Sequence, residues 1–508
     1  VVNTGTVNIA DTERGIYVDR IVANNATFTG GVLNVNESIN LDSGITTFGG
    51  NVLGSGVLTL AEGATMNIGT STIHLDTMNI DGTVIASIEN SRPYGHLYGT
   101  INAGENALLQ LNVGSVGTYK IFNSETDINI DAGAVYVVKN NGLDGIEIST
   151  KPIEDIAADT GLSANAAGAV ASLANVASKD TNIQKVSLAA QKALNSGDVE
   201  TGEKETAKLN PEDKPVAQSV ASSVQNQVLA LTSGRMSGGV ANIGRSGGDE
   251  TAQESGFWAQ GLFNKTKNAS NFHGYTRGFA LGMDTVIDRK YTLGFGFAYN
   301  NTDVHSGSRS TDINSDTLFV YGQYKPSDWY VNATLAYTMA EYTENVDPFG
   351  VAIESNYDVD TYGAQLMTGY DLAYGFTPEA GLRYLHITQD TYNNGVNTIK
   401  GSDTDFLSGV AGLKYTFAIE TENALQLRPE MRAAATYDFI SDKAETTVVM
   451  PGTGTYKVGG ERLSRFGGEF GIGLTAEYKG MEFSVSYDLG LHEDYTSQTG
   501  MIKFRSQF

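Results

Sequence analysis

The chain has 508 residues and a formal net charge of −25, with 59 Gly, 9 Pro and no Cys. The acidic excess argues against nucleic acid or anionic lipid as a partner, because both are bound by clustered Lys and Arg. The lack of Cys excludes thiol nucleophiles, thiolate metal sites and disulfides. We expect no metal and no other cofactor, and the abundance of Gly is typical of a β-rich chain with many turns.

Residues 1–150 are a repetitive β segment. Short stretches such as Gly31–Val35 and Gly56–Leu60 alternate apolar with polar residues and are separated by Gly, Asn and Asp. Short, evenly spaced strands with no helical segments between them predict a parallel β-helix or a related solenoid, with the apolar side chains inside. Because the opening residues 1–5 resemble the middle of a repeat, we expect the chain to be the C-terminal part of a longer protein.

Residues 151–210 change to an Ala-rich composition in which strand alternation stops and helix formers dominate. We predict helices over Asp155–Asn175 and Ile183–Leu194. The charged segment Gly197–Lys208 is interpreted as a mobile linker. The whole region is therefore predicted to be a helical connector.

Residues 211–256 begin with a clearer helix. Asn210 is a suitable N-cap and Pro211 suits the first helical position. One narrow apolar stripe runs along an otherwise small and polar helix: Val216, Val220, Val224, Val228 and Leu231. A helix of about 20 residues spans roughly 30 Å, the thickness of a bilayer's hydrocarbon core. This helix is too polar to face lipid but slim enough to span a pore, so we predict a pore helix followed by a linker.

Residues 257–508 repeat one pattern many times. In Tyr291–Tyr299, bulky apolar residues occupy one parity, and Thr, Gly and Ala occupy the other. We count twelve such segments, centred near residues 261, 280, 296, 319, 333, 366, 381, 411, 430, 471, 485 and 503. Segments of about ten residues with alternating polarity, in an even number, are the signature of a bacterial outer-membrane barrel.

The connections between these segments also alternate in length. Arg289–Lys290 and Lys479–Gly480 are short, whereas Asn300–Ser315 and Glu341–Asn356 are long and polar. Short turns at one end and long loops at the other match the periplasmic and extracellular ends of such a barrel.

The polar parity indicates which face is inside. Rows of charged residues cannot be buried in a dry core, but a wet lumen accepts them. The residues predicted to face the lumen are Gly294, Gly296, Gln426, Arg428, Glu430, Arg432 and Glu469. We expect the two glycines to leave room for the pore helix, and Tyr321 to belong to an aromatic girdle at the membrane interface.

The predicted fold is therefore all-β: a twelve-stranded antiparallel outer-membrane β-barrel with a lumenal α-helix, preceded by a β-helix or solenoid. A soluble antiparallel sheet with one charged face is the competing interpretation. It is disfavoured because twelve aromatic-faced strands would need a second layer that this sequence does not supply.

The last 300 or so residues resemble the translocator of classical autotransporters, which carry out type V secretion. The resemblance rests on Gly256–Gly261, which opens the first strand after the pore helix, on the twelve strands, and on the C-terminal residues Gly500–Phe508. Gln365–Tyr370 and Pro378–Tyr384 are most similar to rickettsial surface-antigen autotransporters.

The resemblance implies a function. The barrel would sit in outer-membrane lipid, export its own N-terminal β-helical passenger and display it on the cell surface as an adhesin-like antigen with a ligand on a host cell. The barrel-assembly machinery would read the last strand through Ile502, Phe504 and Phe508. Ser506 departs from the family's pattern, in which that position is apolar. A monomer is expected.

Two alternatives stay open at this point: a carrier for a secreted enzyme whose catalytic part lies upstream, and a plugged porin-like barrel. The chain itself is not expected to be an enzyme, because His74 and His96 each stand alone. Some members of the resembled family cleave themselves at an asparagine of the pore helix. Asn226 is the corresponding candidate here, although the family's paired Asn is absent.

Overall fold

The computed structural model describes residues 4–9, 15–88, 96–177, 180–211, 216–237, 254–268, 272–421, 425–443, 445–451, 454–459, 464–493 and 495–507. The chain divides into two compact units. Unit 1 is Val1–Asn210 with Pro348–Val351 and Met450–Tyr456, and unit 2 is the remainder. None of the described helices is long and apolar enough to cross a membrane.

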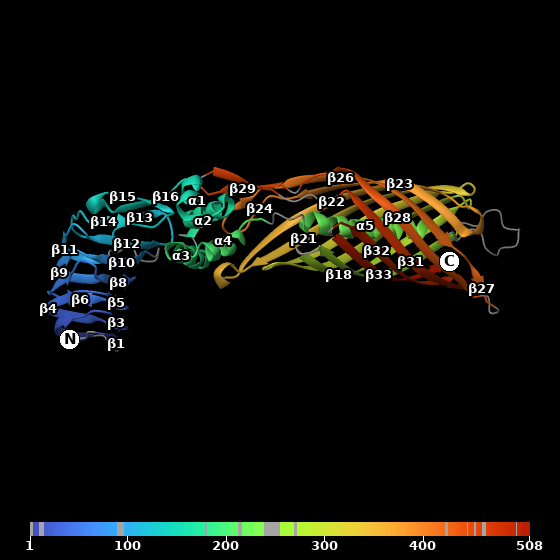
Figure 1. The fold of residues 1–508 in the computed structure, drawn as a ribbon. Coiled ribbons are helices and arrows are strands. Elements are labelled where there is room, and N and C mark those ends of the chain that lie inside the picture. The colour runs from blue at the N-terminus through green and yellow to red at the C-terminus, as the bar shows by residue number, and fades with distance from the viewer. Residues whose placement is uncertain are drawn as a thin grey trace. The chain divides into compact units, whose positions relative to one another are not determined.

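Unit 1 begins with a solenoid of two parallel sheets (Figure 1). The first sheet is ordered β1 (Gly5–Asn8), β3 (Ala26–Thr29), β5 (Ile45–Phe48), β8 (Thr65–Gly69), β10 (Thr83–Ile88), β12 (Leu108–Val113) and β14 (Asn129–Asp131). The second is ordered β11 (Leu97–Ala103), β9 (Ile73–Ile80), β6 (Val52–Leu53), β4 (Leu33–Leu41) and β2 (Ile16–Val22), with β7 (Val57–Leu60) also pairing with β4 and β9. Successive turns of the chain thus stack in parallel, and the predicted solenoid is confirmed.

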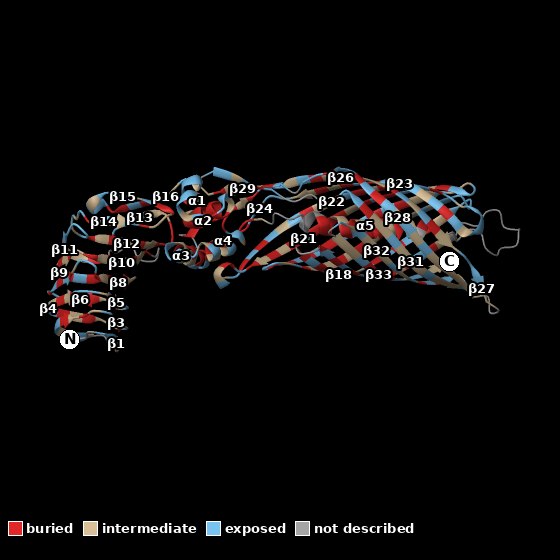
Figure 2. Ribbon diagram, in the orientation of Figure 1, coloured by how far each residue is buried: buried red, intermediate tan, exposed pale blue. Residues whose placement is uncertain are grey.

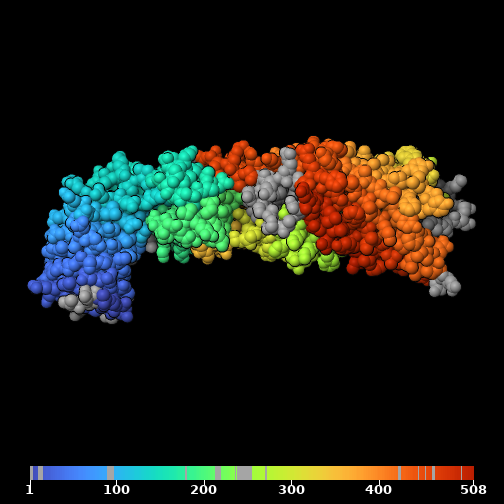
Figure 3. Space-filling model, viewed as in Figure 1, coloured from blue at the N-terminus to red at the C-terminus, as the bar shows by residue number. Residues whose placement is uncertain are grey.

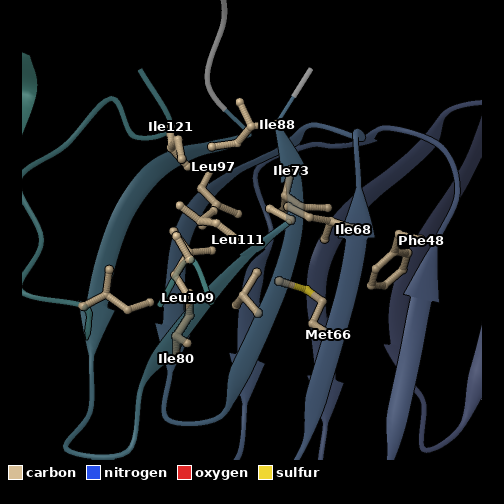
Figure 4. Packing of buried hydrophobic residues seen from close by; sticks show 14 of the residues in the cluster. Phe48, Met66, Ile68, Ile73, Ile80, Ile88, Leu97, Leu109, Leu111 and Ile121 are labelled. Atoms are coloured by element: carbon tan, nitrogen blue, oxygen red, sulfur yellow. The ribbon is translucent and has the colours of Figure 1, made fainter. Parts of the chain in front are cut away.

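Apolar residues line up from one coil to the next inside the solenoid. Met66 of β8 is in register with Val84 of β10, and Val84 is in register with Leu109 of β12. Figure 4 shows such side chains packed into one interior, where Met66 and Leu109 have no exposed surface. Complete burial stabilises a side chain of this size by about 1.5–3 kcal/mol, so the stacked interior is the main source of stability.

The solenoid is followed by a small antiparallel sheet and four helices. The sheet consists of β13 (Gly117–Tyr119), β15 (Tyr136–Asn140) and β16 (Ile146–Thr150), with the short helix η1 (Gly142–Asp144) before β16. The helices are α1 (Ile153–Thr160), α2 (Ala164–Val176), α3 (Thr181–Asn195) and α4 (Val199–Ala207).

The helical region differs from the prediction in two places. The expected helix Asp155–Asn175 is broken, because Gly161 adopts a left-handed conformation with φ of 78° and the Ser163 side chain then caps α2 by accepting from the Ala166 N–H. The expected linker Gly197–Lys208 is mostly the helix α4. Its composition is charged, but local chemistry favours a helix there.

Two residues explain why α4 forms. The carboxylate of Asp198 accepts a hydrogen bond from the Thr201 N–H at 3.2 Å, which is an N-cap. Gly202 faces α3 so closely that an added Cβ would lie 2.9 Å from a methyl of Leu194. The missing side chain therefore allows close packing, which outweighs the low helix propensity of Gly.

One hydrophobic core runs from Ile9 in the solenoid to Ala174 in α2. The backbone also continues this connection, since the Val116 N–H donates to the Ala174 carbonyl at 2.9 Å. The first two helices thus close the C-terminal end of the solenoid core, which is what the terminal cap of a solenoid does.

Unit 2 is a closed antiparallel barrel. Its long strands in the described part of the chain are β17 (Glu254–Asn268), β18 (Phe272–Ile287), β19 (Tyr291–Ser306), β20 (Arg309–Tyr324), β21 (Trp329–Val346), β22 (Ile353–Tyr370), β23 (Phe376–Gln389), β26 (Ser402–Thr416), β28 (Gln426–Ser441), β31 (Phe466–Tyr478), β32 (Met481–His492) and β33 (Tyr495–Gln507). Each long strand pairs with its sequence neighbour in this list, and β17 pairs with β33, so the ring is complete. The two-residue strand β27 (Ile419–Glu420) is paired with β28. The twelve predicted strands are confirmed.

We call the end at which β18 meets β19 the turn end, and the opposite end the loop end. The predicted loop Asn300–Ser315 is wrong, because β19 continues to Ser306 and β20 starts at Arg309. Similarly, β21 and β22 extend into Glu341–Asn356 and leave only the short helix η3 (Pro348–Gly350) between them. These strands continue past their apolar segments, because the backbone groups of polar residues also form hydrogen bonds between neighbouring strands.

The longer connections at the loop end contain structure of their own. A small sheet is formed by β24 (Tyr392–Asn393), β25 (Thr398–Ile399), β29 (Glu445–Met450) and β30 (Gly454–Gly459). At the turn end, the short helix η4 (Ala373–Gly375) connects β22 to β23.

The solenoid buries the apolar face of its strands, whereas the barrel exposes the apolar face and encloses the small or polar face. More buried and more exposed residues alternate along much of the barrel wall (Figure 2), and the bulky residues of β19, such as Phe295, face outward with 61% exposure. The C-terminal strands form a continuous wall on the face seen in Figure 3. Helix α5 (Val216–Ser237) lies inside the barrel (Figure 1). It begins after the predicted cap, and Asn210 instead donates to the Asn165 carbonyl at 3.1 Å.

Candidate functional site: the barrel lumen

Helix α5 packs mainly against one side of the barrel, the strands β19 to β23. The predicted apolar stripe makes this contact in two clusters. Val220 and Val224 pack near the loop end in a cluster with Ile313 and other wall residues. Val228 and Leu231 pack in a second cluster with Trp258. The remaining stripe residue, Val216, begins the helix, but its side chain lies outside the described residues.

Polar contacts attach the helix to the same side. Thr338 donates to the Gln225 amide oxygen at 2.8 Å, and the hydroxyls of Thr232 and Thr334 are 2.9 Å apart. Gln365 donates to the Ser233 hydroxyl at 2.6 Å. Near the turn end, Gln323 donates to the carbonyl of Met236 at 2.8 Å. These partners come from the adjacent strands β20, β21 and β22.

Aromatic side chains fill the space above glycines on this wall. An added Cβ at Gly294 would lie 2.3 Å from the ring of Tyr321, and one at Gly296 would lie 2.4 Å from the ring of Phe319. Both rings are buried and belong to the cluster that contacts α5. The two glycines therefore make room for rings of the neighbouring strand, and these rings, rather than the glycines themselves, meet the helix. Tyr321 is correspondingly lumenal, and its predicted place in the aromatic girdle is wrong.

The opposite wall is lined with charges. Arg428, Glu430 and Arg432 of β28 line a cavity of about 440 Å³ at the turn end, between this wall and the C-terminal half of α5. Other charged residues around the cavity are Lys325, Asp371, Lys414, Glu482, Asp488 and Lys503. Arg428 pairs with Glu477 at 3.0 Å. Gln426, at the start of β28, is half-buried and is not among the residues that line the cavity.

Glu469, the last residue predicted to face the lumen, joins several strands. Arg383 of β23 donates to its carboxylate at 2.8 Å, and Arg432 of β28 lies 3.8 Å from it. Arg432 is also 3.6 Å from Asp488 of β32. Arg383 further donates to Gln365 at 3.1 Å, the residue that contacts α5. A series of hydrogen bonds and ion pairs thus connects the helix to the charged wall across the lumen.

A second ion-pair network joins the last strand, β33, to β18 and β32. Arg505 of β33 donates to Asp284 of β18 at 3.1 Å and to Glu482 of β32 at 3.3 Å. Its guanidinium crosses β17 at Gly256, where an added Cβ would lie 2.9 Å from it. Asp284 also accepts from Tyr321 at 2.8 Å. Arg505 is almost completely buried, so these carboxylates offset the cost of removing its charge from water.

The structure also places the remaining candidates. Ile502 and Phe504 of β33 face outward, while Phe508 lies outside the described residues. Asn226 lies beside a cavity of about 80 Å³ on the loop-end side of the lumen, which Arg383 and Glu469 also line. No described group of His, Asp and Glu residues is arranged to hold a metal ion.

Sequence reasoning did not single out Arg383, Asp284, Trp258 or Arg505. Each lies on the inward parity of its strand, and that parity was the available signal. Their partners lie on strands far apart in the sequence, so only the register of the closed barrel shows which charges meet. The need for a glycine at position 256, in particular, follows only from the Arg505 guanidinium that packs against it.

Residues 255–488 match the family model described as autotransporter beta-domain. Outer membrane protein A of Rickettsia conorii is 26% identical over 328 residues, which cover 57% of this chain and 16% of that protein. Outer membrane protein B of Rickettsia typhi is 22% identical over 526 residues, which cover 96% of this chain and 31% of that protein. The chain thus spans less than a third of the length of these relatives. Among solved structures, the translocator domain of autotransporter NalP from Neisseria meningitidis is similar, with 15% identity, a TM-score of 0.45, and coverage of 57% of this chain and 98% of that chain.

Proposed function

We propose that the barrel, most of which matches the autotransporter beta-domain model, lies in the bacterial outer membrane and exports and displays the solenoid that precedes it. The observation that carries this proposal is the position of α5. The segment that follows unit 1 in the chain lies inside the closed barrel, against β19 to β23. A chain whose connecting segment occupies the lumen is arranged as if it had been transported through it.

The chemistry of the barrel supports transport of a polypeptide. The outward parity is apolar, which suits lipid, while the inward parity offers Ser, Thr, Gln and paired charges. Such a lining can form hydrogen bonds with a polypeptide backbone in transit, and it offers no large apolar surface to which the polypeptide would adhere. The solenoid would gain most of its stability only after export, because its coils bury their apolar residues against one another.

We further propose that the exported solenoid is an adhesin-like surface antigen whose ligand lies on a host cell, and that the chain is not an enzyme. The outward-facing Ile502 and Phe504 of the last strand suit recognition by the barrel-assembly machinery during insertion. Neither the enzyme-carrier alternative nor the plugged-porin alternative has an observation of its own in its favour.

The absence of Cys permits a direct test of display. Ser55→Cys places one thiol on the exposed surface of the solenoid, and Ser327→Cys is a matched control in an exposed turn at the turn end. A membrane-impermeant maleimide added to intact cells should label the Ser55→Cys protein and leave the Ser327→Cys protein unlabelled. Both should react after lysis. Labelling of Ser55→Cys only after lysis would contradict export of the solenoid.

A further inference from the structure

Helix α5 does not fill the barrel lumen. It is held by β19 to β23, and the charged wall opposite borders open space. The cavity of about 440 Å³ at the turn end is lined by Ala230 and Gly234 of the helix. The cavity of about 80 Å³ is lined by helix residues from Ser219 to Asn226. The two cavities therefore lie at successive levels along the helix.

The space between these two levels is much narrower. A third cavity of about 30 Å³ shares Arg432 with the first cavity, and shares Arg383 and Glu469 with the second. That volume holds about one or two water molecules. A hydrated ion that travels beside the helix must pass this level, where Arg383, Arg432 and Glu469 line the cavity together with the charged side chains of Glu379, Lys414 and Glu430.

At this narrow part of the lumen, both arginines pair with the carboxylate of Glu469. Arg383 on β23 donates to Glu469 on β31 at 2.8 Å, and Arg432 on β28 is 3.8 Å from the same carboxylate. The strands β26 and β28 separate β23 from β31 in the barrel, so the first pair is a chord across part of the lumen. Gln365 connects Arg383 to Ser233 of the helix, which leaves no break between α5 and the pair.

We propose that Arg383, Glu469 and Arg432 form a salt-bridge gate that closes an ion path beside α5. We call these three residues the lumenal gate. The helix alone does not seal the barrel, because it packs mainly against β19 to β23 and cavities remain between it and the charged wall. The gate closes the remaining passage through paired charges that can separate, whereas the apolar helix contacts stay in place. This inference concerns small ions and does not depend on export of the solenoid.

The charges of the gate predict opposite selectivity for opposite substitutions. Glu469→Gln removes the carboxylate that Arg383 and Arg432 share and leaves Arg432 paired with Asp488, so the constriction becomes more positive by one charge and its preference shifts toward anions. Arg383→Gln combined with Arg432→Gln removes two positive charges and leaves Glu379, Glu430, Glu469 and Asp488 near Lys414, so the preference shifts toward cations. Charged side chains that line a constriction select ions in this way.

The full chain, reconstituted in planar bilayers under a potassium chloride gradient, provides the test. Both variants should conduct at least about threefold more than the parent, because an unpaired charge no longer closes the passage. The reversal potential should shift toward the chloride potential for Glu469→Gln and toward the potassium potential for the double variant. The double variant Arg277→Gln with Asp303→Asn is the matched control, since that pair lies 3.3 Å apart on the outward face and should change neither quantity.

Heat-modifiable migration on a gel identifies the folded barrels, and each of the two gate variants tests the proposal by itself. Unchanged conductance and selectivity in a folded gate variant would overturn the proposal. A parent chain that already conducts as well as a barrel lacking α5 would also overturn it, because no closed gate would then exist.

Discussion

The solenoid and the barrel are both built from strands of alternating polarity, but the solenoid buries the apolar face of its strands and the barrel encloses the small or polar face. In the solenoid, Met66 and its neighbours point inward and have no exposed surface. In the barrel, Phe295 points outward, and the small or polar parity faces the lumen. Alternation thus predicts a strand with two unlike faces, but it does not say which face is inside. The chemistry of the second parity decides that question.

The face of each strand that is not apolar differs in chemistry between the two regions. Outward positions of the solenoid carry exposed polar and charged residues that pair along the stack, such as Asn102, which donates to Asn79 at 2.8 Å, and Arg20, which pairs with Glu37. Inward positions of the barrel carry ions that pair across strands, such as Arg383 and Glu469. Enclosed charges of both signs require a lumen in which water and counter-charges are available. The comparison predicts that the two interiors respond differently to a new charge.

The largest expected effect is a charge inside the solenoid. Met66→Lys should destabilise unit 1 by more than about 3 kcal/mol, because an unpaired ammonium would replace a fully buried thioether. Ser486→Lys is the matched change in the barrel, where Ser486 borders the turn-end cavity, and it should cost less than about 1 kcal/mol. Urea unfolding followed by circular dichroism measures the first, and heat-modifiable migration follows the second. Equal tolerance at both positions would contradict the contrast between a dry and a wet interior.

The next effect concerns the barrel seam. Arg505→Met should destabilise the barrel by about 3 kcal/mol, because the buried carboxylates of Asp284 and Glu482 would both lose the guanidinium that pairs with them. The measurement is the urea concentration at which the folded band disappears from a gel. Combining Arg505→Met with Asp284→Asn should recover part of the loss. If the two changes simply add, the pair is not the coupled unit described above.

A smaller effect is expected where a glycine accommodates an aromatic ring. Gly294→Ala should cost about 1–3 kcal/mol, because its methyl group would overlap the Tyr321 ring. Gly261→Ala is the matched control, since an added Cβ there meets no atom within 4 Å. Both are measured as barrel stability in urea. A cost for Gly261→Ala as large as that for Gly294→Ala would show that propensity, rather than the ring contact, is responsible.

A helix cap in unit 1 should have a still smaller effect. The carboxylate of Asp180 accepts from the N–H groups of Asn182 and Ile183 at 2.7 and 3.1 Å, so Asp180→Ala should cost about 1 kcal/mol. Asp180→Asn keeps the acceptor and should cost much less. The midpoint of urea unfolding of unit 1 measures both changes, and equal losses would show that the charge matters more than the cap.

The smallest expected effect is a pH dependence at Glu205. Burial acts to raise the pKa of this carboxyl, but hydrogen bonds from Lys208 and the Phe349 N–H outweigh burial and hold the pKa below its usual range. Its contribution to stability is therefore present above the pKa of unfolded Glu, about 4.3, and is lost as the pH falls through the lower folded value. Glu205→Gln should remove this component from the acid limb of the unfolding curve. An unchanged acid limb would contradict the assignment.

Much of the architecture could be predicted from sequence, for reasons that are local. Alternation alone predicts the twelve strands, and the charged parity of β28 indicates a wet lumen. The errors arose where distant contacts decide the outcome. Gly202 is compatible with α4 only because Leu194 packs against it, and Tyr321 is lumenal only because Gly294 leaves room for its ring. The partners of Arg505 and Arg383 depend on barrel register, which no single strand encodes.

The central claim is that the segment joining the solenoid to the barrel occupies and obstructs the lumen. Planar-bilayer conductance of the full chain, compared with a variant that lacks Val216–Ser237, tests it most directly. Removal of α5 should greatly increase the single-channel conductance, because the helix lies in the lumen, while heat-modifiable migration is retained, because the ring of strands closes through pairing between the strands themselves. Equal conductance with and without the helix would contradict the account.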